Sequence, residues 1–229
     1  MKYCKKIINY LLDIILPKFC VGCNRKDCFF CDDCFSMIDI SPYRYCCCAH
    51  PTRLSLDQSC SKCAHRSLDR IYSASSLEDK FAKKLIYETR SHFQIKELCL
   101  PISAMILTHL KYIDFEFDES MMFIPVPIHK KEERVRGFSQ SKEIVRIISN
   151  TIPMPCSFDN LVRIRDSGDI KGCFSVNTPD TIKDKIILLI DDVFMTGSTM
   201  EECAKVLKDN GAKSVYGITA LRKPPERLT

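Results

Sequence analysis

The architecture expected of this chain follows from one segment, Ile187-Leu-Leu-Ile-Asp-Asp-Val-Phe-Met-Thr-Gly-Ser-Thr199. Its apolar run begins at Ile186 and is unbroken to Ile190, as in a strand that is buried on both faces of a parallel sheet. The turn is followed by an amphipathic helix that ends at Asn210-Gly211. Strand, turn and helix in this order predict an α/β domain built on a parallel sheet.

The turn after this strand is suited to bind a phosphate. Backbone N–H groups at the start of a helix attract anions, and hydroxyl groups can add further donors. Two acidic residues just upstream would repel a phosphate, so we expect them to accept hydrogen bonds from sugar hydroxyls or to bind Mg²⁺ through water. The segment therefore predicts a site for a ribose 5-phosphate, made by Asp191, Asp192, Thr196, Ser198 and Thr199. In the alternative, the acidic residues form an N-terminal turn and the hydroxyls only cap the helix.

Upstream segments supply the other elements expected of this domain. Periodic apolar residues predict helices over 80–91 and 95–110, and Lys83, Lys84 and Arg90 are expected on a solvated helix face. Residues 121–127 form a short apolar run that ends in prolines, which predicts a buried strand. A loop over 128–140 holds several cations, which either bind phosphate or are plain solvated surface, and a helix is expected from about Ser139.

Cysteine is concentrated near the N-terminus, where 11 of the 15 Cys lie before residue 64. The pairs Cys20/Cys23 and Cys31/Cys34 have the C-x2-C spacing of a zinc ribbon, in which four thiolates surround one Zn²⁺. A second set contains Cys60/Cys63 and the triplet 46–48, which could supply ligands in more than one way. One Zn²⁺, with a second as an option, is therefore predicted, and the ligands assigned are Cys20, Cys23, Cys31, Cys34, Cys48, Cys60 and Cys63.

Other residues leave the ligand set open. Cys28 with Cys31 gives an alternative C-x2-C pair, and His50 and His65 are possible nitrogen ligands. Several cysteines are expected to be no more than small buried hydrophobic residues, namely Cys4, Cys99, Cys156, Cys173 and Cys203.

Length and composition describe a globular chain with a small extra module. The chain has 229 residues, 45% of them hydrophobic, and a net charge of +5, which excludes a disordered protein and is compatible with an anionic partner. The composition changes near residue 70, so we expect an amphipathic helix and a zinc-ribbon module over 1–70 and the α/β domain over 71–229. The apolar run 7–16 is too short to cross a bilayer, and no signal-peptide cleavage site is present. A cytoplasmic protein is predicted, whose first helix contacts the inner membrane at most peripherally.

Three blocks of the sequence resemble a known family. Residues 187–199 resemble the phosphoribosyl pyrophosphate signature of type I phosphoribosyltransferases. Pro125-Val-Pro-Ile-His, Arg136-Gly-Phe-Ser-Gln140 and the Cys-rich front resemble the ComF competence family in the same order. The implied fold is a type I phosphoribosyltransferase-like parallel sheet flanked by helices, preceded by a small Cys-rich zinc-ribbon module.

This resemblance also implies a ligand and partners. Asp191 and Asp192 would hold the ribose hydroxyls, and the turn with Met195 and Gly197 would hold the 5-phosphate. The pyrophosphate and Mg²⁺ would lie at the loop over 127–136, with His129, Lys130 and Arg136. The expected function is the handling of incoming single-stranded DNA in natural transformation, with DNA-uptake helicase or channel proteins as further candidate partners. The zinc module and the cations Lys130, Lys131 and Arg134 would contact the DNA.

Departures from the family pattern leave catalysis open. Met195 replaces a usual Thr, and the segment between Arg165 and Gly172 is short where type I enzymes have a flexible hood that closes over the reaction. A phosphate site without a full hood suits a ligand-binding protein. The alternative is an active phosphoribosyltransferase, or a phosphoribosyl pyrophosphate hydrolase, with an unknown acceptor.

Overall fold

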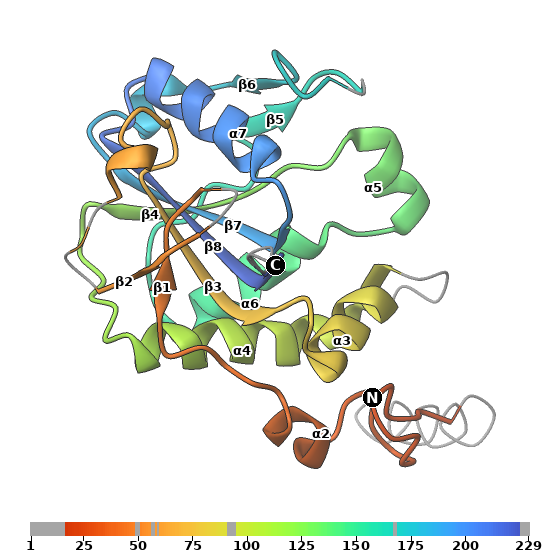
Figure 1. The fold of residues 1–229 in the computed structure, drawn as a ribbon. Coiled ribbons are helices and arrows are strands. Elements are labelled where there is room, and N and C mark those ends of the chain that lie inside the picture. The colour runs from red at the N-terminus through yellow and green to blue at the C-terminus, as the bar shows by residue number, and fades with distance from the viewer. Residues whose placement is uncertain are drawn as a thin grey trace.

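A mostly parallel sheet forms the centre of the molecule (Figure 1). The computed structural model describes residues 17–48, 51–55, 58, 60–90, 95–166 and 169–224. Six strands lie in the order β2-β1-β3-β8-β7-β4, and the last four of these are mutually parallel. Their bounds are β1 Arg44–Tyr45, β2 Arg53–Leu54, β3 Arg70–Ser76, β4 Met121–Pro125, β7 Ile186–Phe194 and β8 Ser214–Arg222. The predicted α/β fold with a parallel sheet is confirmed.

Helices cover both faces of this sheet, as Figure 1 shows. One face packs against α3 (Lys80–Arg90), α4 (Cys99–Tyr112) and α6 (Gln140–Thr151). The other packs against α7 (Ser198–Asp209) and an antiparallel hairpin of β5 (Leu161–Arg163) and β6 (Phe174–Val176). Ile187 and Leu188 of β7 are fully buried on opposite sides, one in each core, so the unbroken apolar run reflects a central strand.

Short elements complete the description. They are α2 (Asp32–Ser36), α5 (Lys130–Arg136) and the 3-10 turns η1 (Ser61–Cys63), η2 (Lys96–Leu98) and η3 (Pro179–Thr181).

Two local predictions were wrong. The charged loop over 128–140 contains the helix α5, because the His129 ring accepts the N–H of Lys131 at its start and Gly137, with φ 75°, ends it in the left-handed conformation. The strand before the phosphate turn does not stop at Ile190. It continues through both acidic residues to Phe194, because Asp191 and Val193 still pair with Thr219 and Leu221 of β8.

The Cys-rich part is joined to the sheet. Tyr45 of β1 pairs with Ile71 of β3, and the N–H of Ser41 donates to the carbonyl of Ala74 at 2.8 Å. The β1–β2 hairpin therefore forms the edge of the same sheet that carries the phosphate turn. The predicted helix over 7–16 and His50 lie outside the described residues.

Candidate phosphate and metal sites

The turn after β7 forms a pocket at the carboxyl end of the central strand. The pocket has a volume of about 210 Å³ and is lined by Arg90, Asp191 and residues 193–200. Gly197 has φ 79°, and a Cβ atom there would lie 2.4 Å from the ring of Phe194. Only glycine allows the chain to pass this ring, so the sequence of the turn fixes the shape of the pocket.

Most of the predicted phosphate residues are brought together at this pocket. Met195, Thr196, Gly197, Ser198 and Thr199 all line it. The hydroxyl oxygens of Thr196 and Ser198 lie 2.9 Å apart, and the N–H of Ser198 donates to the Thr196 hydroxyl at 3.3 Å. Hydroxyl groups and the start of a twelve-residue helix therefore face the same space.

The two acidic residues of β7 have different surroundings. Asp191 lines the pocket and accepts hydrogen bonds from the Ser141 hydroxyl and from the N–H of Asp192, both at 2.9 Å. Asp192 is 1% exposed and forms a two-point ion pair with the guanidinium group of Arg90, whose Nε lies 2.7 Å from the carboxylate. Successive side chains of a strand point in opposite directions, so only Asp191 reaches the pocket directly. Asp192 holds Arg90 at the pocket instead.

The charge state of Asp191 follows from this arrangement. Burial, and then the charge of Asp192, raise the pKa of the Asp191 carboxyl to about 7. Hydrogen bonds from Asp192 and Ser141 and the charge of Arg90 counteract part of this shift. At neutral pH the group can both accept hydrogen bonds and exchange a proton.

The cations predicted for the pyrophosphate belong to α5 or to its N-terminal cap. His129 caps α5, Lys130 is exposed in its first turn and Arg136 is its last residue. Neither His129 nor Lys130 is among the described residues that line the pocket.

Arg90 and Ser141 were missed from the sequence. Arg90 was expected on a solvated face and instead contacts Asp192, although its side chain remains 44% exposed. Arg90 is the last residue of α3, the helix that follows β3 in the sequence. The available signal was this position, because β3 lies in the same sheet as β7. Ser141 follows directly after the Arg136–Gln140 block and had no separate signal.

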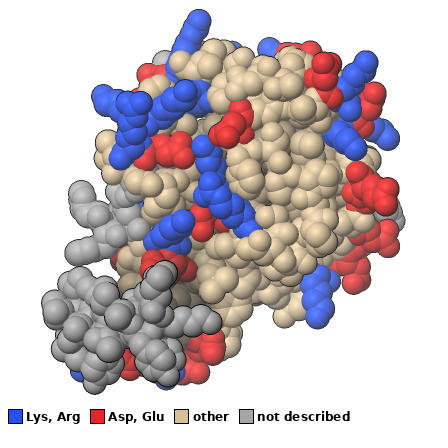
Figure 2. All heavy atoms as spheres, turned by 180° about the vertical axis from the view of Figure 1, so that it is seen from behind, with Lys and Arg blue, Asp and Glu red and all other residues tan. Residues whose placement is uncertain are grey.

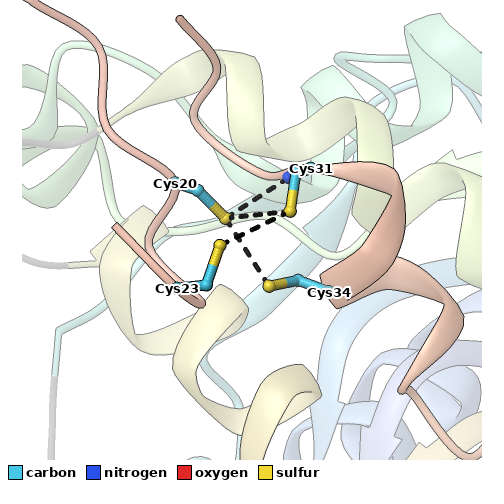
Figure 3. A group of neighbouring side chains, drawn as sticks. All are labelled: Cys20, Cys23, Cys31 and Cys34. Carbon is cyan, nitrogen blue, oxygen red and sulfur yellow. Dashed lines mark hydrogen bonds between the residues drawn. The ribbon is translucent and has the colours of Figure 1, made fainter. Parts of the chain in front are cut away.

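The first cysteine cluster has the geometry of a structural zinc site (Figure 3). Cys20 and Cys23 come from a turn, Cys31 and Cys34 from the start of α2, and the four sulfur atoms point toward one another. Sulfur–sulfur distances are 3.6 Å for Cys20–Cys31, 3.7 Å for Cys20–Cys34 and 3.6 Å for Cys23–Cys31. A tetrahedron with Zn–S bonds of about 2.3 Å requires about 3.8 Å between sulfurs, so these residues fit a Zn²⁺ ion.

The turn of this cluster depends on Gly22. A Cβ atom at this position would lie 2.5 Å from the sulfur of Cys34, so a side chain would enter the space between the ligands. The cluster also packs on Phe30 and on Phe81 of α3, which attaches it to the helix that ends at Arg90.

The second cluster settles which cysteines of the triplet belong to the site. The sulfur atoms of Cys46, Cys48, Cys60 and Cys63 lie within 4.8 Å of one another, with 3.8 Å between Cys48 and Cys60. Cys46 was left out of the predicted set. Cys47 points into the core with Leu68, Ile71 and the inner face of α7.

Hydrogen bonds favour a thiolate in each cluster. Burial raises the pKa of Cys20, but backbone N–H donors of Cys23, Cys31 and Gly22 outweigh it and lower the pKa to about 6. Burial likewise raises the pKa of Cys46, and donors from Thr52 and the Cys48 backbone lower it to about 6. Burial raises the pKa of Cys34 and of Cys48, so each cluster contains one thiol that ionises readily, and metal binding would have to displace protons from others.

Three of the cysteines expected to be small buried hydrophobic residues are fully buried, and Cys4 lies outside the described residues. Cys99, Cys173 and Cys203 are fully buried and Cys156 is half-buried, while Cys28 packs beside the first cluster without belonging to it. No helix in the described parts of the chain has both the length and the apolar character that a bilayer crossing needs. On the face seen in Figure 2, cations and acidic residues are interspersed around a broad uncharged area.

Comparison with known proteins defines the class of the domain. Residues 134–228 match the family model of the phosphoribosyl transferase domain. This match covers β5 through β8 and the whole pocket turn, so this part of the chain is similar to phosphoribosyl transferase domains.

Curated relatives narrow the resemblance. The chain is 27% identical over 115 residues to the competence protein ComFC of Bacillus subtilis (strain 168), covering 46% of each chain. It is also 27% identical over 104 residues to the DNA utilization protein YhgH of Escherichia coli O157:H7, covering 40% of this chain and 45% of that one. It thus spans less than half the length of these relatives. Together with the phosphoribosyl transferase domain and the two cysteine clusters, they confirm the resemblance to the ComF family.

Solved structures with a related fold are more distant. The hypoxanthine-guanine phosphoribosyl transferase of L. donovani is 12% identical, with a TM-score of 0.38 over 58% of this chain and 72% of that chain. The fold assignment therefore depends on the strand order and on the family model.

Proposed function

We propose that this protein is a ComF-like DNA-utilisation protein whose phosphoribosyl transferase domain binds phosphoribosyl pyrophosphate with Mg²⁺. The pocket after β7 is the observation that carries the proposal. It joins a carboxylate, three hydroxyl residues and a helix start in one cavity, which is the combination that a sugar phosphate requires.

Each part of the ligand has a partner in this arrangement. The 5-phosphate would lie on the N–H groups and hydroxyls of the turn. The ribose hydroxyls would donate to Asp191, which Ser141 orients from α6. Arg90, held by the buried Asp192, would place a positive charge near the pyrophosphate, and Mg²⁺ would neutralise the remaining charge. The family relation supports single-stranded DNA as the macromolecular partner, because the relatives are named for competence and DNA utilization.

Calorimetry with phosphoribosyl pyrophosphate and Mg²⁺ tests the small-molecule part. We expect Asp191→Asn to weaken binding at least tenfold, because an amide cannot accept both ribose hydrogen bonds in the way that a carboxylate does. Asp180→Asn, a substitution at an exposed site in η3, is the matched control and should bind as the parent does. Equal affinity of the parent protein and Asp191→Asn would refute the site.

We also expect Asp191→Asn to change the thermal stability of the protein in a defined direction. The pKa of Asp191 is raised from its usual 3.8 to about 7, so the folded state binds more protons than the unfolded state between these values. Stability from this group is lost as the pH rises through that window. The Asn variant should therefore equal or exceed the parent in Tm above pH 7, which separates lost binding from lost folding.

The alternative is an active transferase, and incubation of the protein with phosphoribosyl pyrophosphate and Mg²⁺ tests it. Release of pyrophosphate from phosphoribosyl pyrophosphate, with and without single-stranded DNA, would identify turnover. Binding without release would identify the compound as a ligand of a DNA-handling protein.

A further inference from the structure

A groove that the phosphate site does not use lies between the β1–β2 hairpin and the end of α4. It has a volume of about 510 Å³, and its walls include Tyr43, Arg53, Tyr112 and Asp114. In Figure 1 the hairpin and this end of α4 lie on the side of the molecule away from α5.

Aromatic rings are exposed in this groove. Tyr43 is 37% exposed and Tyr112 is 57% exposed, whereas most other aromatic side chains of the described chain are buried or half-buried. The guanidinium group of Arg53 lies over the Tyr43 ring at 2.9 Å from its centre. Exposed rings beside an arginine provide flat surfaces on which unpaired bases can stack.

The groove has an excess of positive charge. Arg44 and Arg53 line it together with a single carboxylate, Asp114. The helix α5, which also carries cations, contains Glu132 and Glu133 among them, so its field is mixed. The helix α5 has the larger net charge, with four cations against two carboxylates, so exposed aromatic rings and not net charge distinguish the groove as a site for unpaired bases.

The groove is also rigid. The buried Arg44 side chain donates to the carbonyl of Ser55 at 2.8 Å and to that of Gln58, which ties the two arms of the hairpin together. Cys46 and Cys48 follow β1 directly and belong to the second cluster, so bound zinc would hold the hairpin in place.

A second cavity continues from this groove. It has a volume of about 320 Å³, shares Pro42 and Tyr43 with the first and is lined by Tyr45 and Arg222. The guanidinium group of Arg222 lies 5.3 Å from the ring centre of Tyr45 and 5.7 Å from that of Phe194. Both Arg222 and Phe194 are buried, so this second cavity supports the wall of the groove rather than extending its exposed aromatic surface.

We propose that single-stranded DNA binds along this groove, with a base stacked on the exposed ring of Tyr112 and with a backbone phosphate at Arg53, whose guanidinium group is stacked on Tyr43. The inference deepens the proposed function, since it names the surface of the protein that holds the DNA. Stacking requires unpaired bases, so duplex DNA should bind more weakly.

Fluorescence anisotropy with a labelled oligothymidylate and the zinc-loaded full chain tests this surface. Tyr112→Ala should weaken binding about tenfold, the loss expected for one stacked base. Arg53→Gln should weaken binding and reduce the dependence of log Kd on log salt by about one phosphate contact. Tyr87→Ala, at a tyrosine of α3 that is 68% exposed, and Arg165→Gln, at an exposed arginine beside β5, are the matched controls and should bind as the parent does.

Three results would overturn the proposal, and each is distinct. If Tyr112→Ala and Arg53→Gln bind as tightly as the controls while Arg134→Gln does not, the DNA lies on α5. If duplex DNA binds as tightly as the single strand, the bases are not stacked in the groove. If the parent protein binds no DNA, this inference fails together with the DNA part of the proposed function, while calorimetry still reports on the sugar-phosphate site.

Discussion

Neighbouring residues take different roles in this chain. Asp191 reaches the pocket, while Asp192 is buried against Arg90. Cys46 and Cys48 belong to a metal cluster, while Cys47 between them lies in the core. In β7 the cause is strand alternation, because successive side chains point to opposite sides, whereas Cys47 and Cys48 lie in bends of the chain after β1.

The cysteine triplet gives a test at single residues. Parent protein should contain two zinc ions, and Cys46→Ser should contain one, since it removes a ligand of the second cluster. Cys47→Ala, at the neighbouring position, is the matched control. It leaves a small cavity in the core and should retain both ions with a lower Tm.

Metal analysis by plasma emission after dialysis measures this difference. One zinc in the parent, or two in Cys46→Ser, would contradict the assignment of Cys46 as a ligand.

Most of the residues that line the candidate site could be predicted from the sequence, but not all of them. The turn residues Thr196 to Thr199 were predictable, because glycine and hydroxyl residues after an apolar strand are a local signal. The contact of Arg90 with Asp192 was not, since the two residues are 102 positions apart and meet only when β3 and β7 join one sheet.

How well a single helix or strand could be predicted depended on what defines its ends. The apolar pattern predicted β4, β7, α3 and α6 to within a few residues, because periodicity reports burial directly. It did not predict α5, which has few apolar residues and is defined by a cap at His129 and by Gly137. It also placed the end of β7 too early, because charged residues in a strand are tolerated where a pocket and an ion pair accept them.

The turn between β7 and α7 can be tested with two glycines. Gly197 and Gly137 both have a positive φ, so alanine at either costs about 1–2 kcal/mol of unfolding free energy. At Gly197 the new Cβ also meets the Phe194 ring, whereas at Gly137 nothing lies within 4 Å. Gly197→Ala should therefore cost about 3 kcal/mol or more, since overpacking adds to the backbone term.

Urea denaturation of the two variants measures this comparison. Equal losses of stability would mean that the ring of Phe194 moves freely and does not shape the pocket.

The whole molecule combines an α/β domain with two cysteine clusters, each attached to a different part of it. The first cluster packs on α3 through Phe81, and the second lies at the β1–β2 edge of the sheet. The parallel strands and their helices form cores that consist mainly of aliphatic residues. The metal clusters and the sheet should therefore contribute to stability in different ways.

Removal of zinc tests this organisation. Chelation at neutral pH should release both ions and lower Tm, because metal bound only to the folded state stabilises it. Far-ultraviolet circular dichroism below the new Tm should change little, since β3, β8, β7 and β4 hold no cluster ligand. A collapse of the helical signal on chelation would show instead that the α/β domain cannot fold without metal.

The narrow hairpin at the side of the sheet has a consequence for how molecules of this protein behave toward one another. β2 is only two residues long and presents Arg53, so it offers little backbone for recruitment of a foreign strand. Beneath it, β3 has seven residues and a nearly continuous buried stretch, which is the kind of border that copies of a chain use to polymerise. If the hairpin depends on metal at the second cluster, we expect oxidation of its cysteines or loss of that metal to expose this edge of β3 and to promote aggregation.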